Sequence, residues 1–170
     1  MRERFVLAAD IDLVRRRADA AFAELVPELR AMLPASAAIH HVGATSVPGC
    51  LTKDDLDVNV RLPAADFDAA EHALAARFGR NIGTIRTADF ASFKDDARDP
   101  PLGIQLTAFG SDYDFFLDFQ SALAADAKVV AAYNALKRRH DGGDMDAYRA
   151  EKSRFIRERI AWRGGGNAAE

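Results

Sequence analysis

The residues best suited to chemistry lie between positions 39 and 62, in the stretch IHHVGATSVPGCLTKDDLDVNVRL. Asp55 and Asp57 stand two residues apart in an alternating apolar segment, so their side chains project from one face of a predicted strand. Carboxylates at this spacing can share a divalent cation, which in nucleotidyl transfer bridges substrate phosphates and offsets developing charge. The pair therefore predicts a Mg²⁺ site in which Asp55 and Asp57 are both metal ligands and catalytic residues.

A glycine-containing turn, GATSVPG, precedes these carboxylates. Gly43 allows a phosphate to approach the backbone closely, and the hydroxyl groups of Thr45 and Ser46 can donate hydrogen bonds to phosphate oxygens. Lys53 stands just before the carboxylate strand and can neutralise phosphate charge. We therefore expect Gly43, Thr45, Ser46 and Lys53 to bind the phosphate groups of a small ligand.

Two further lysines lie near the C-terminus on predicted helices. Lys137 follows Tyr133 by four residues and Lys152 follows Tyr148 by four, so each lysine lies beside an apolar helix stripe. A lysine in such a place either extends to water or meets an anion in a cleft. Both remain candidate phosphate-binding residues.

Each candidate also has a purely structural interpretation. Asp57 can serve as a strand carboxylate that makes hydrogen bonds, and Asp55 as a solvated residue where the strand begins. Lys53 can be an ordinary surface lysine. His41, just before the turn, is better explained as a core or hydrogen-bonded histidine than as a metal ligand.

The elements that must position these residues follow from hydrophobic periodicity and turn signals. Helices are predicted over residues 11–33, 64–78, 112–123, 126–140 and 144–162, and strands over residues 38–42, 55–62, 84–93 and 103–109. This order predicts an α+β fold with a small mixed β-sheet flanked by helices, the C-terminal helices packing on the core. We expect a single domain over residues 1–164 and a disordered tail over residues 165–170.

Composition narrows the choice of partners. The chain has 170 residues, of which 49% are hydrophobic, and its formal net charge is -3. A mildly acidic chain is not expected to bind duplex nucleic acid through its overall charge. A local basic pocket for one small phosphorylated ligand is compatible with this net charge. The single cysteine, Cys50, excludes an internal disulfide, and no signal peptide or membrane span is recognisable. A cytoplasmic protein without membrane contact fits these features, and the oligomeric state is left open.

The stretch of residues 39–62 also resembles the GrpB family, predicted nucleotidyltransferases of the polymerase-β-like superfamily. The family's hallmark is a histidine, an aliphatic residue, a Gly-Ser-Thr turn, a Val-Pro-Gly turn, and then a lysine and an aspartate in an apolar strand. This chain supplies the matching residues in order: His41, Val42, Gly43, Thr45, Ser46, Val47, Pro48, Gly49, Lys53 and Asp57. The segments YNALKRR and YRAEKSRFI resemble the two C-terminal Tyr/Lys helices of the family.

The resemblance implies a nucleotidyltransferase-like fold and metal-dependent transfer of a nucleoside monophosphate from a triphosphate to an acceptor hydroxyl or amine. In that reaction Asp57, with Asp55, would hold Mg²⁺, while Thr45 and Ser46 would bind the β- and γ-phosphates. The lysines at positions 53, 137 and 152 would neutralise charge.

Three departures from the family pattern favour a second function. Ala44 replaces the serine after the glycine, Gln105 stands where the family presents a histidine, and residues 119–124 lack two arginines and an aspartate. These losses fit a catalytically impaired module that binds a nucleotide or another small anion in the same cleft. Converging carboxylates would favour catalysis, whereas a lone Asp57 would favour binding.

Overall fold

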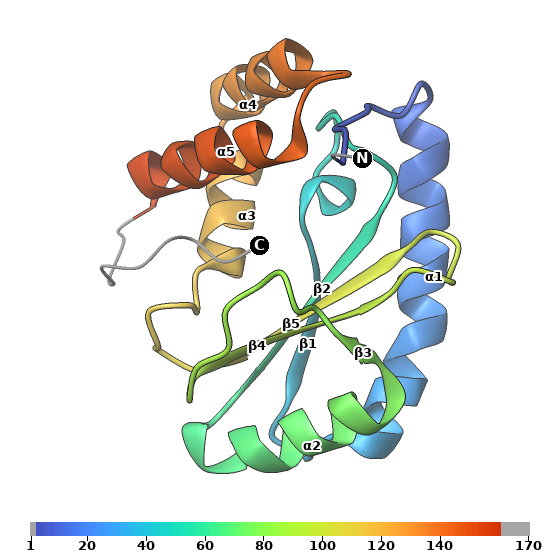
Figure 1. Cartoon of the computed structure of the whole chain (residues 1–170), viewed down its shortest axis with the longest axis vertical. Coiled ribbons are helices and arrows are strands. Elements are labelled where there is room, and N and C mark those ends of the chain that lie inside the picture. The colour runs from blue at the N-terminus through green and yellow to red at the C-terminus, as the bar shows by residue number, and fades with distance from the viewer. Residues whose placement is uncertain (1–2, 161–170) are drawn as a thin grey trace.

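The structure is a computed structural model that describes residues 3–160. A five-stranded mixed sheet in the order β1-β2-β5-β4-β3 forms the centre of the fold (Figure 1). Strands β2 and β5 pair in parallel, whereas the other neighbouring strands pair antiparallel. The strands are β1 (Ala38–Val42), β2 (Leu56–Leu62), β3 (Gly79–Arg80), β4 (Phe90–Asp95) and β5 (Leu102–Ala108).

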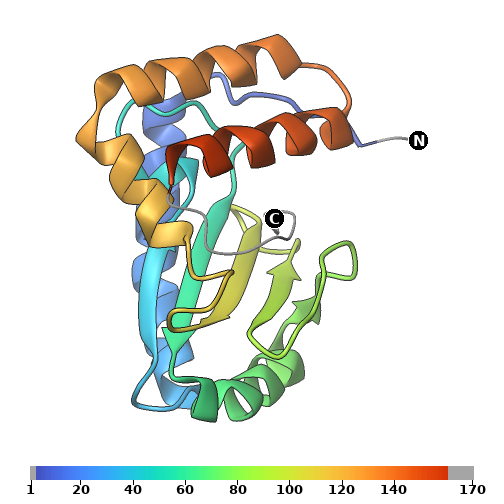
Figure 2. The same ribbon diagram turned by 90° about the vertical axis from the view of Figure 1, so that its left-hand side faces the viewer.

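Within residues 3–160, five α-helices pack around this sheet in two groups. Helices α1 and α2 share one hydrophobic core with strands β2, β4 and β5, while α3, α4 and α5 enclose a second apolar cluster. Figure 2 shows α3, α4 and α5 gathered at one end of the sheet, with α2 at the opposite end. The helices are α1 (Ile11–Met32), α2 (Phe67–Arg77), α3 (Phe116–Ala125), α4 (Ala127–His140) and α5 (Met145–Arg159).

Strand β2 owes its position to its alternating sequence. The side chains of Leu56, Val58, Val60 and Leu62 are buried in the core shared with α1 and α2. Burial of four such apolar side chains fixes the register of the strand, because a slip of one residue would turn them all to the other face. The same alternation turns Asp57 toward the α3–α5 side.

The N-terminal segment ties the second group of helices to the rest of the fold. Phe5 is buried and stacks on Tyr148 of α5 with ring centroids 3.8 Å apart. Its backbone N–H donates to the carbonyl of Gly143 at 3.0 Å, and its carbonyl accepts from Gly142 at 2.7 Å. Ala8 then donates to the carbonyl of Thr52 at 2.8 Å, close to the glycine turn.

Two predicted elements differ from the structure. The strand expected over residues 84–93 is wrong in its first half, because residues 84–89 form a loop and β4 starts only at Phe90. Ile82 and Ile85 in that region are exposed, so their apolar character does not mark a buried strand. The helix expected over residues 112–123 begins at Phe116, since a turn over residues 111–114 precedes it.

The ends of the chain set the limits of the description. Helix α5 ends at Arg159. Residues 161–162 of the helix predicted over 144–162, and the predicted tail over residues 165–170, lie outside the described residues. Within residues 3–160, every helix is too short or too polar to cross a bilayer.

Candidate functional site

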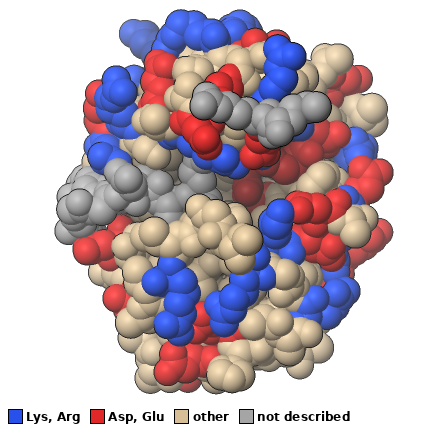
Figure 3. Space-filling model, viewed as in Figure 1, with Lys and Arg blue, Asp and Glu red and all other residues tan. Residues whose placement is uncertain are grey.

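A cleft of about 1160 Å³ separates the sheet from the C-terminal helices. Its sheet side is formed by the glycine turn, the start of β2 and the start of β5, and its other side by residues of α3, α4 and α5. Figure 3 shows acidic and basic side chains together around the hollow in this face of the molecule. The six predicted site residues that line it are Gly43, Lys53, Asp55, Asp57, Lys137 and Lys152.

Asp57 occupies a slot between two glycines. In the sheet it pairs with Val42 of β1 on one side and with Gly103 of β5 on the other. A Cβ built on Gly43 would stand 2.5 Å from Oδ2 of Asp57, and one built on Gly103 would stand 3.1 Å from Oδ1. Side chains at either glycine would therefore press on the carboxylate, and the two glycines leave it room at the cleft.

The electrostatic setting of Asp57 is typical of a functional carboxylate. Burial, followed by the negative charge of Asp55, raises the pKa of Asp57 to about 6. The positive charges of Lys152 and Lys53 and a hydrogen bond from Gln105 act in the opposite direction. The carboxylate is thus desolvated, next to a second carboxylate and within reach of two cationic side chains.

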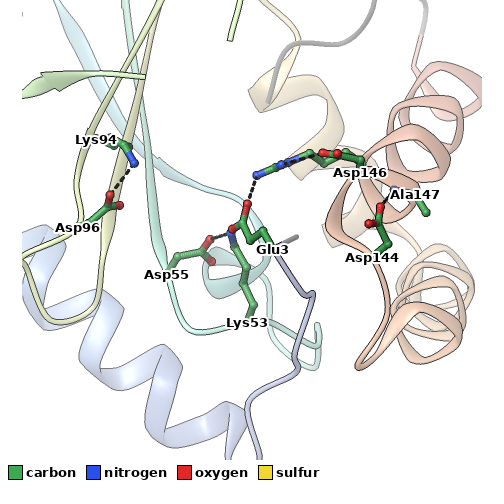
Figure 4. Close-up of polar contacts among 9 residues, drawn as sticks. Glu3, Lys53, Asp55, Lys94, Asp96, Asp144, Asp146 and Ala147 are labelled. Carbon is green, nitrogen blue, oxygen red and sulfur yellow. Dashed lines mark hydrogen bonds and ion pairs between the residues drawn. The ribbon is translucent and has the colours of Figure 1, made fainter. Parts of the chain in front are cut away.

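Asp55 faces the same cleft but is engaged with a lysine. Its Oδ2 lies 3.4 Å from Nζ of Lys53, and Figure 4 shows these two side chains turned toward one another. Within residues 3–160, no three His, Cys, Asp or Glu side chains converge in a way that could hold a metal ion. Several other carboxylates also line the cleft, and Asp55 and Asp57 are the two whose negative charges interact to raise the pKa of Asp57.

Thr45 lies behind the cleft instead of lining it. The residue is buried, its Oγ1 lies 2.9 Å from Nε2 of His41, and its hydroxyl donates to the backbone carbonyl of Asp55 at 3.2 Å. On the far side, Nδ1 of His41 lies 3.2 Å from Asp19, and burial lowers the pKa of His41. The Thr45 hydroxyl therefore links the turn to the start of β2, and our proposal assigns it no phosphate contact.

Ser46 has a comparable internal role. Its hydroxyl donates to the carbonyl of Gly43 at 2.6 Å and accepts a hydrogen bond from Nε2 of Gln120 at 2.8 Å. The same amide group of Gln120 donates to the carbonyl of His41 at 2.9 Å. These bonds shape the turn from within, and it is Gly43 and Ala44 that line the cleft.

Lys137 is almost fully buried and holds the turn from the side of α4. Only 2% of the residue is exposed, and its ammonium group donates to the carbonyl of Leu51 and contacts Sγ of Cys50 at 3.6 Å. It also lies 3.9 Å above the ring of Tyr133. Burial lowers the pKa of Lys137 to about 8. The side chain therefore contributes first to the structure of the turn.

Asn134, one helical turn before Lys137, was not among the predicted site residues. Its Oδ1 accepts from the backbone N–H of Leu51 at 2.8 Å, and its Nδ2 donates to the carbonyl of Gly49 at 2.8 Å. Periodicity alone could not reveal it, because the turn and α4 are about 85 residues apart in the chain. Asn134 and Lys137 together anchor the Val-Pro-Gly turn to α4.

Lys152 fits the expected role better than Lys137. It lines the cleft from α5, lies 5.9 Å from the ring of Tyr148, and lowers the pKa of Asp57 through its charge. With Lys53 on the opposite side, it provides positive charge near the Asp57 carboxylate. This arrangement suits an anionic ligand that approaches Asp57 from the open side of the cleft.

Comparison with known proteins decides the family. The profile described as GrpB protein matches residues 10–161, which is most of the chain. This chain belongs to the GrpB family. The resemblance drawn from the glycine turn and the two C-terminal helices is thereby confirmed.

Relatives of the family extend the match. A UPF0157 protein of Vibrio cholerae serotype O1 is 32% identical over 134 residues, which cover 78% of this chain and 70% of the relative. The crystal structure of the conserved protein GrpB from Enterococcus faecalis superposes with a TM-score of 0.65 at 17% identity, covering 83% of this chain and 91% of that one.

A second solved structure shares the fold at lower similarity. The structure of the Cid1 poly(U) polymerase, described as MgGTP bound, matches with a TM-score of 0.52 at 14% identity. The match covers 77% of this chain but only 43% of the polymerase. It shows the fold alone. The α+β architecture is therefore nucleotidyltransferase-like, as predicted.

Proposed function

We propose that this GrpB-family protein binds a nucleotide in the cleft and transfers a nucleoside monophosphate to an acceptor in a Mg²⁺-dependent reaction. The observation that carries the proposal is the Asp57 carboxylate, set between Gly43 and Gly103 and opposite Lys152. Such a site offers hard oxygen ligands, close backbone approach and positive charge within one cleft. The fold shared with the Mg-nucleotide complex of the Cid1 polymerase supports it.

The donor set fits magnesium. Asp57 and Asp55 supply carboxylate oxygens from positions two residues apart in one segment, and Mg²⁺ commonly uses one or two carboxylates together with waters and substrate phosphates. Held by these carboxylates, Mg²⁺ would supply electrostatic stabilisation of the charge that develops on the phosphates. Asp57 would be the principal ligand, since Asp55 is also engaged with Lys53.

The remaining residues of the site would bind and orient the nucleotide. Gly43 and Ala44 would let phosphate oxygens approach the backbone of the turn, because Gly43 has no side chain and Ala44 a single methyl group. Lys53 and Lys152 would neutralise phosphate charge from opposite sides. We further propose a small ligand in place of duplex nucleic acid, and a cytoplasmic location.

One observation favours a second candidate function, a nucleotide- or anion-binding module with impaired catalysis. On the strand beside Asp57, Gln105 donates a hydrogen bond to the carboxylate where a further acid would strengthen metal binding. A neutral amide cannot take up the charge of a second cation. This module would bind Mg²⁺ and nucleotide without turning it over.

The test is calorimetric titration of Mg²⁺ and each of the four nucleoside triphosphates into the purified chain. Replacement of Asp57 by Ala should abolish the Mg²⁺-dependent part of nucleotide binding. Asp118→Ala, which removes an exposed carboxylate of α3 that does not line the cleft, serves as the matched control. Unchanged binding in Asp57→Ala would remove the proposed role.

A further inference from the structure

The cleft is larger than one ligand requires. Its volume of about 1160 Å³ exceeds the roughly 300–1,000 Å³ typical of a pocket for a single small molecule. Asp57 stands on β2, between β1 and β5, so the sheet order divides the cleft floor into a β1 side, with the glycine turn, and a β5–β4 side. The proposed nucleotide phosphates would occupy the first side and leave the second open.

The two sides differ in chemistry. On the side of the helices and the glycine turn, the lining carries charges such as Lys53, Asp55 and Lys152. The β5–β4 side presents neutral hydrogen-bonding residues, which are Asn81, Thr84, Ser92 and Gln105. Its charged members Lys94 and Asp96 pair with each other at 2.6 Å, as Figure 4 shows.

Gln105 is the central residue of this neutral side. It is only 7% exposed and pairs in the sheet with Asn59 of β2 and Ser92 of β4, so the three residues form one row across the sheet, and Gln105 and Ser92 line the cleft. Its amide nitrogen donates to the Asp57 carboxylate. Its Oε1 is buried and has no hydrogen-bond partner among the described residues.

A buried acceptor without a donor is unfavourable, so its retention beside Asp57 points to a ligand that supplies the donor. An ammonium group would have to compete with Lys53 and Lys152, whose positive charges already act on the Asp57 carboxylate, and a phosphate would bring only acceptors toward Oε1 and that carboxylate. A hydroxyl group fits both, because it can donate to Oε1 and present its oxygen beside Asp57.

We propose that Gln105 and Ser92 form a second subsite that binds a neutral, hydroxyl-rich small molecule and directs one of its hydroxyl groups toward Asp57. If the proposed nucleotidyl transfer holds, this molecule is the acceptor; the assignment as acceptor rests on that function, whereas the subsite itself does not. The subsite thus defines a substrate class of sugar-like or polyol compounds.

Saturation-transfer NMR on the full chain tests the subsite with named probes. Ribose, glucose and myo-inositol serve as the neutral probes, and glucosamine and glucose 6-phosphate as the charged counterparts. Calorimetry with Mg²⁺ and ATP is run on the same samples. The variants are Gln105→Leu and Ser92→Ala on the neutral side, Lys152→Met on the nucleotide side, and Lys128→Met as the exposed lysine control on α4.

We expect at least one neutral probe to bind and to lose affinity at least fivefold in Gln105→Leu. Ser92→Ala should weaken the same probe and should change ATP affinity less than twofold. Lys152→Met should reduce ATP affinity and leave the affinity for the neutral probe unchanged. Absence of binding by all neutral probes, stronger binding of a charged counterpart, or an unaffected Gln105→Leu variant would overturn the subsite. Binding of a neutral probe without binding of ATP would instead contradict the proposed function.

Discussion

Asp57 and Gly43 are in such close contact that a single added methyl group at Gly43 would meet the carboxylate oxygen at 2.5 Å. The backbone of Gly43 also has a φ of 74°, a value that residues with a side chain rarely adopt. The turn and the carboxylate can therefore not be altered independently. This contact explains why the glycine belongs to the site as much as the acid does.

The first prediction concerns this contact. Gly43→Ala should lower the free energy of unfolding by about 2–4 kcal/mol, because backbone strain and a clash with Asp57 act together, and should abolish Mg²⁺-dependent nucleotide binding. Gly49→Ala is the matched control, since Gly49 has a φ of 76° but no heavy atom within 4 Å of an added Cβ. It should lose only about 1–2 kcal/mol in urea denaturation. An equal loss in the free energy of unfolding for both variants would show that the contact with Asp57 does not contribute to stability.

Thr45 provides the second prediction. Thr45→Val removes the hydroxyl that joins His41 to the carbonyl of Asp55, so the free energy of unfolding should fall by about 1–3 kcal/mol. Thr45→Ser keeps the hydroxyl and should lose about 1 kcal/mol through the missing methyl group. Nucleotide affinity of the folded Val variant, measured by calorimetry, should stay within twofold of the original. A large loss of affinity without loss of stability would return Thr45 to the phosphate site.

The two C-terminal lysines should separate into a structural and a binding residue. Lys137→Met leaves the carbonyl of Leu51 without its donor and should lower the free energy of unfolding by about 1–3 kcal/mol, with little change in ATP affinity. Lys152→Met should do the opposite, with stability changed by less than about 0.5 kcal/mol and ATP affinity reduced about tenfold. Thermal denaturation and calorimetry on both variants give the two readouts. A similar loss of affinity in Lys137→Met would place that lysine at the phosphates.

Glu71 makes stability depend on acid pH. This buried residue of α2 binds Arg80 at 2.7 Å and Arg86 at 2.6 Å, and these hydrogen bonds lower its pKa to about 2 from an ordinary 4.5. Because the folded pKa is the lower one, the stabilisation is complete above pH 4.5 and is lost as the pH falls from 4.5 toward 2. It amounts to about 2–3 kcal/mol at neutral pH.

Urea denaturation at pH 7 and pH 3 checks this expectation. Glu71→Gln should be the less stable chain at pH 7, and its stability should fall less than that of the original chain between the two pH values. Asp68→Asn on the exposed side of α2 is the control for removal of a charge from the same helix. If Glu71→Gln loses as much stability between pH 7 and pH 3 as the original chain, the acid sensitivity belongs to other carboxylates.

The parts of the fold that were predicted correctly are those in which burial and sequence period agree. Strand β2 is the clearest case, because the alternation from Leu56 to Leu62 coincides with burial of its apolar residues. Residues 84–89 of the predicted strand form a loop in the structure, because the apolar Ile85 faces the cleft and solvent and is not buried against the sheet. The spacing of apolar residues shows where hydrophobic side chains recur, but it does not show whether another part of the chain packs against them.

The site was predictable only where it is local. Gly43 and Asp57 lie close in the sequence and carry the family motif, whereas Gln105 reaches Asp57 through the parallel pairing of β2 with β5. Asn134 and Lys137 reach the turn from a helix far along the chain. The hydroxyl groups of the turn have suitable types for phosphate binding, but tertiary contacts with His41 and Gln120 engage them first. Such competition between partners is decided only in the folded chain.

The pairing of Phe5 with residues 142 and 143 also bears on how the molecule is made. A ribosome delivers Phe5 long before the hairpin between α4 and α5, so its partners are missing until that hairpin has been made. Closure of this contact over some 138 positions is entropically slow compared with formation of local helices. The sheet with α1 and α2 can therefore assemble before α4 and α5 are in place, whereas the cleft is complete only once these helices have docked.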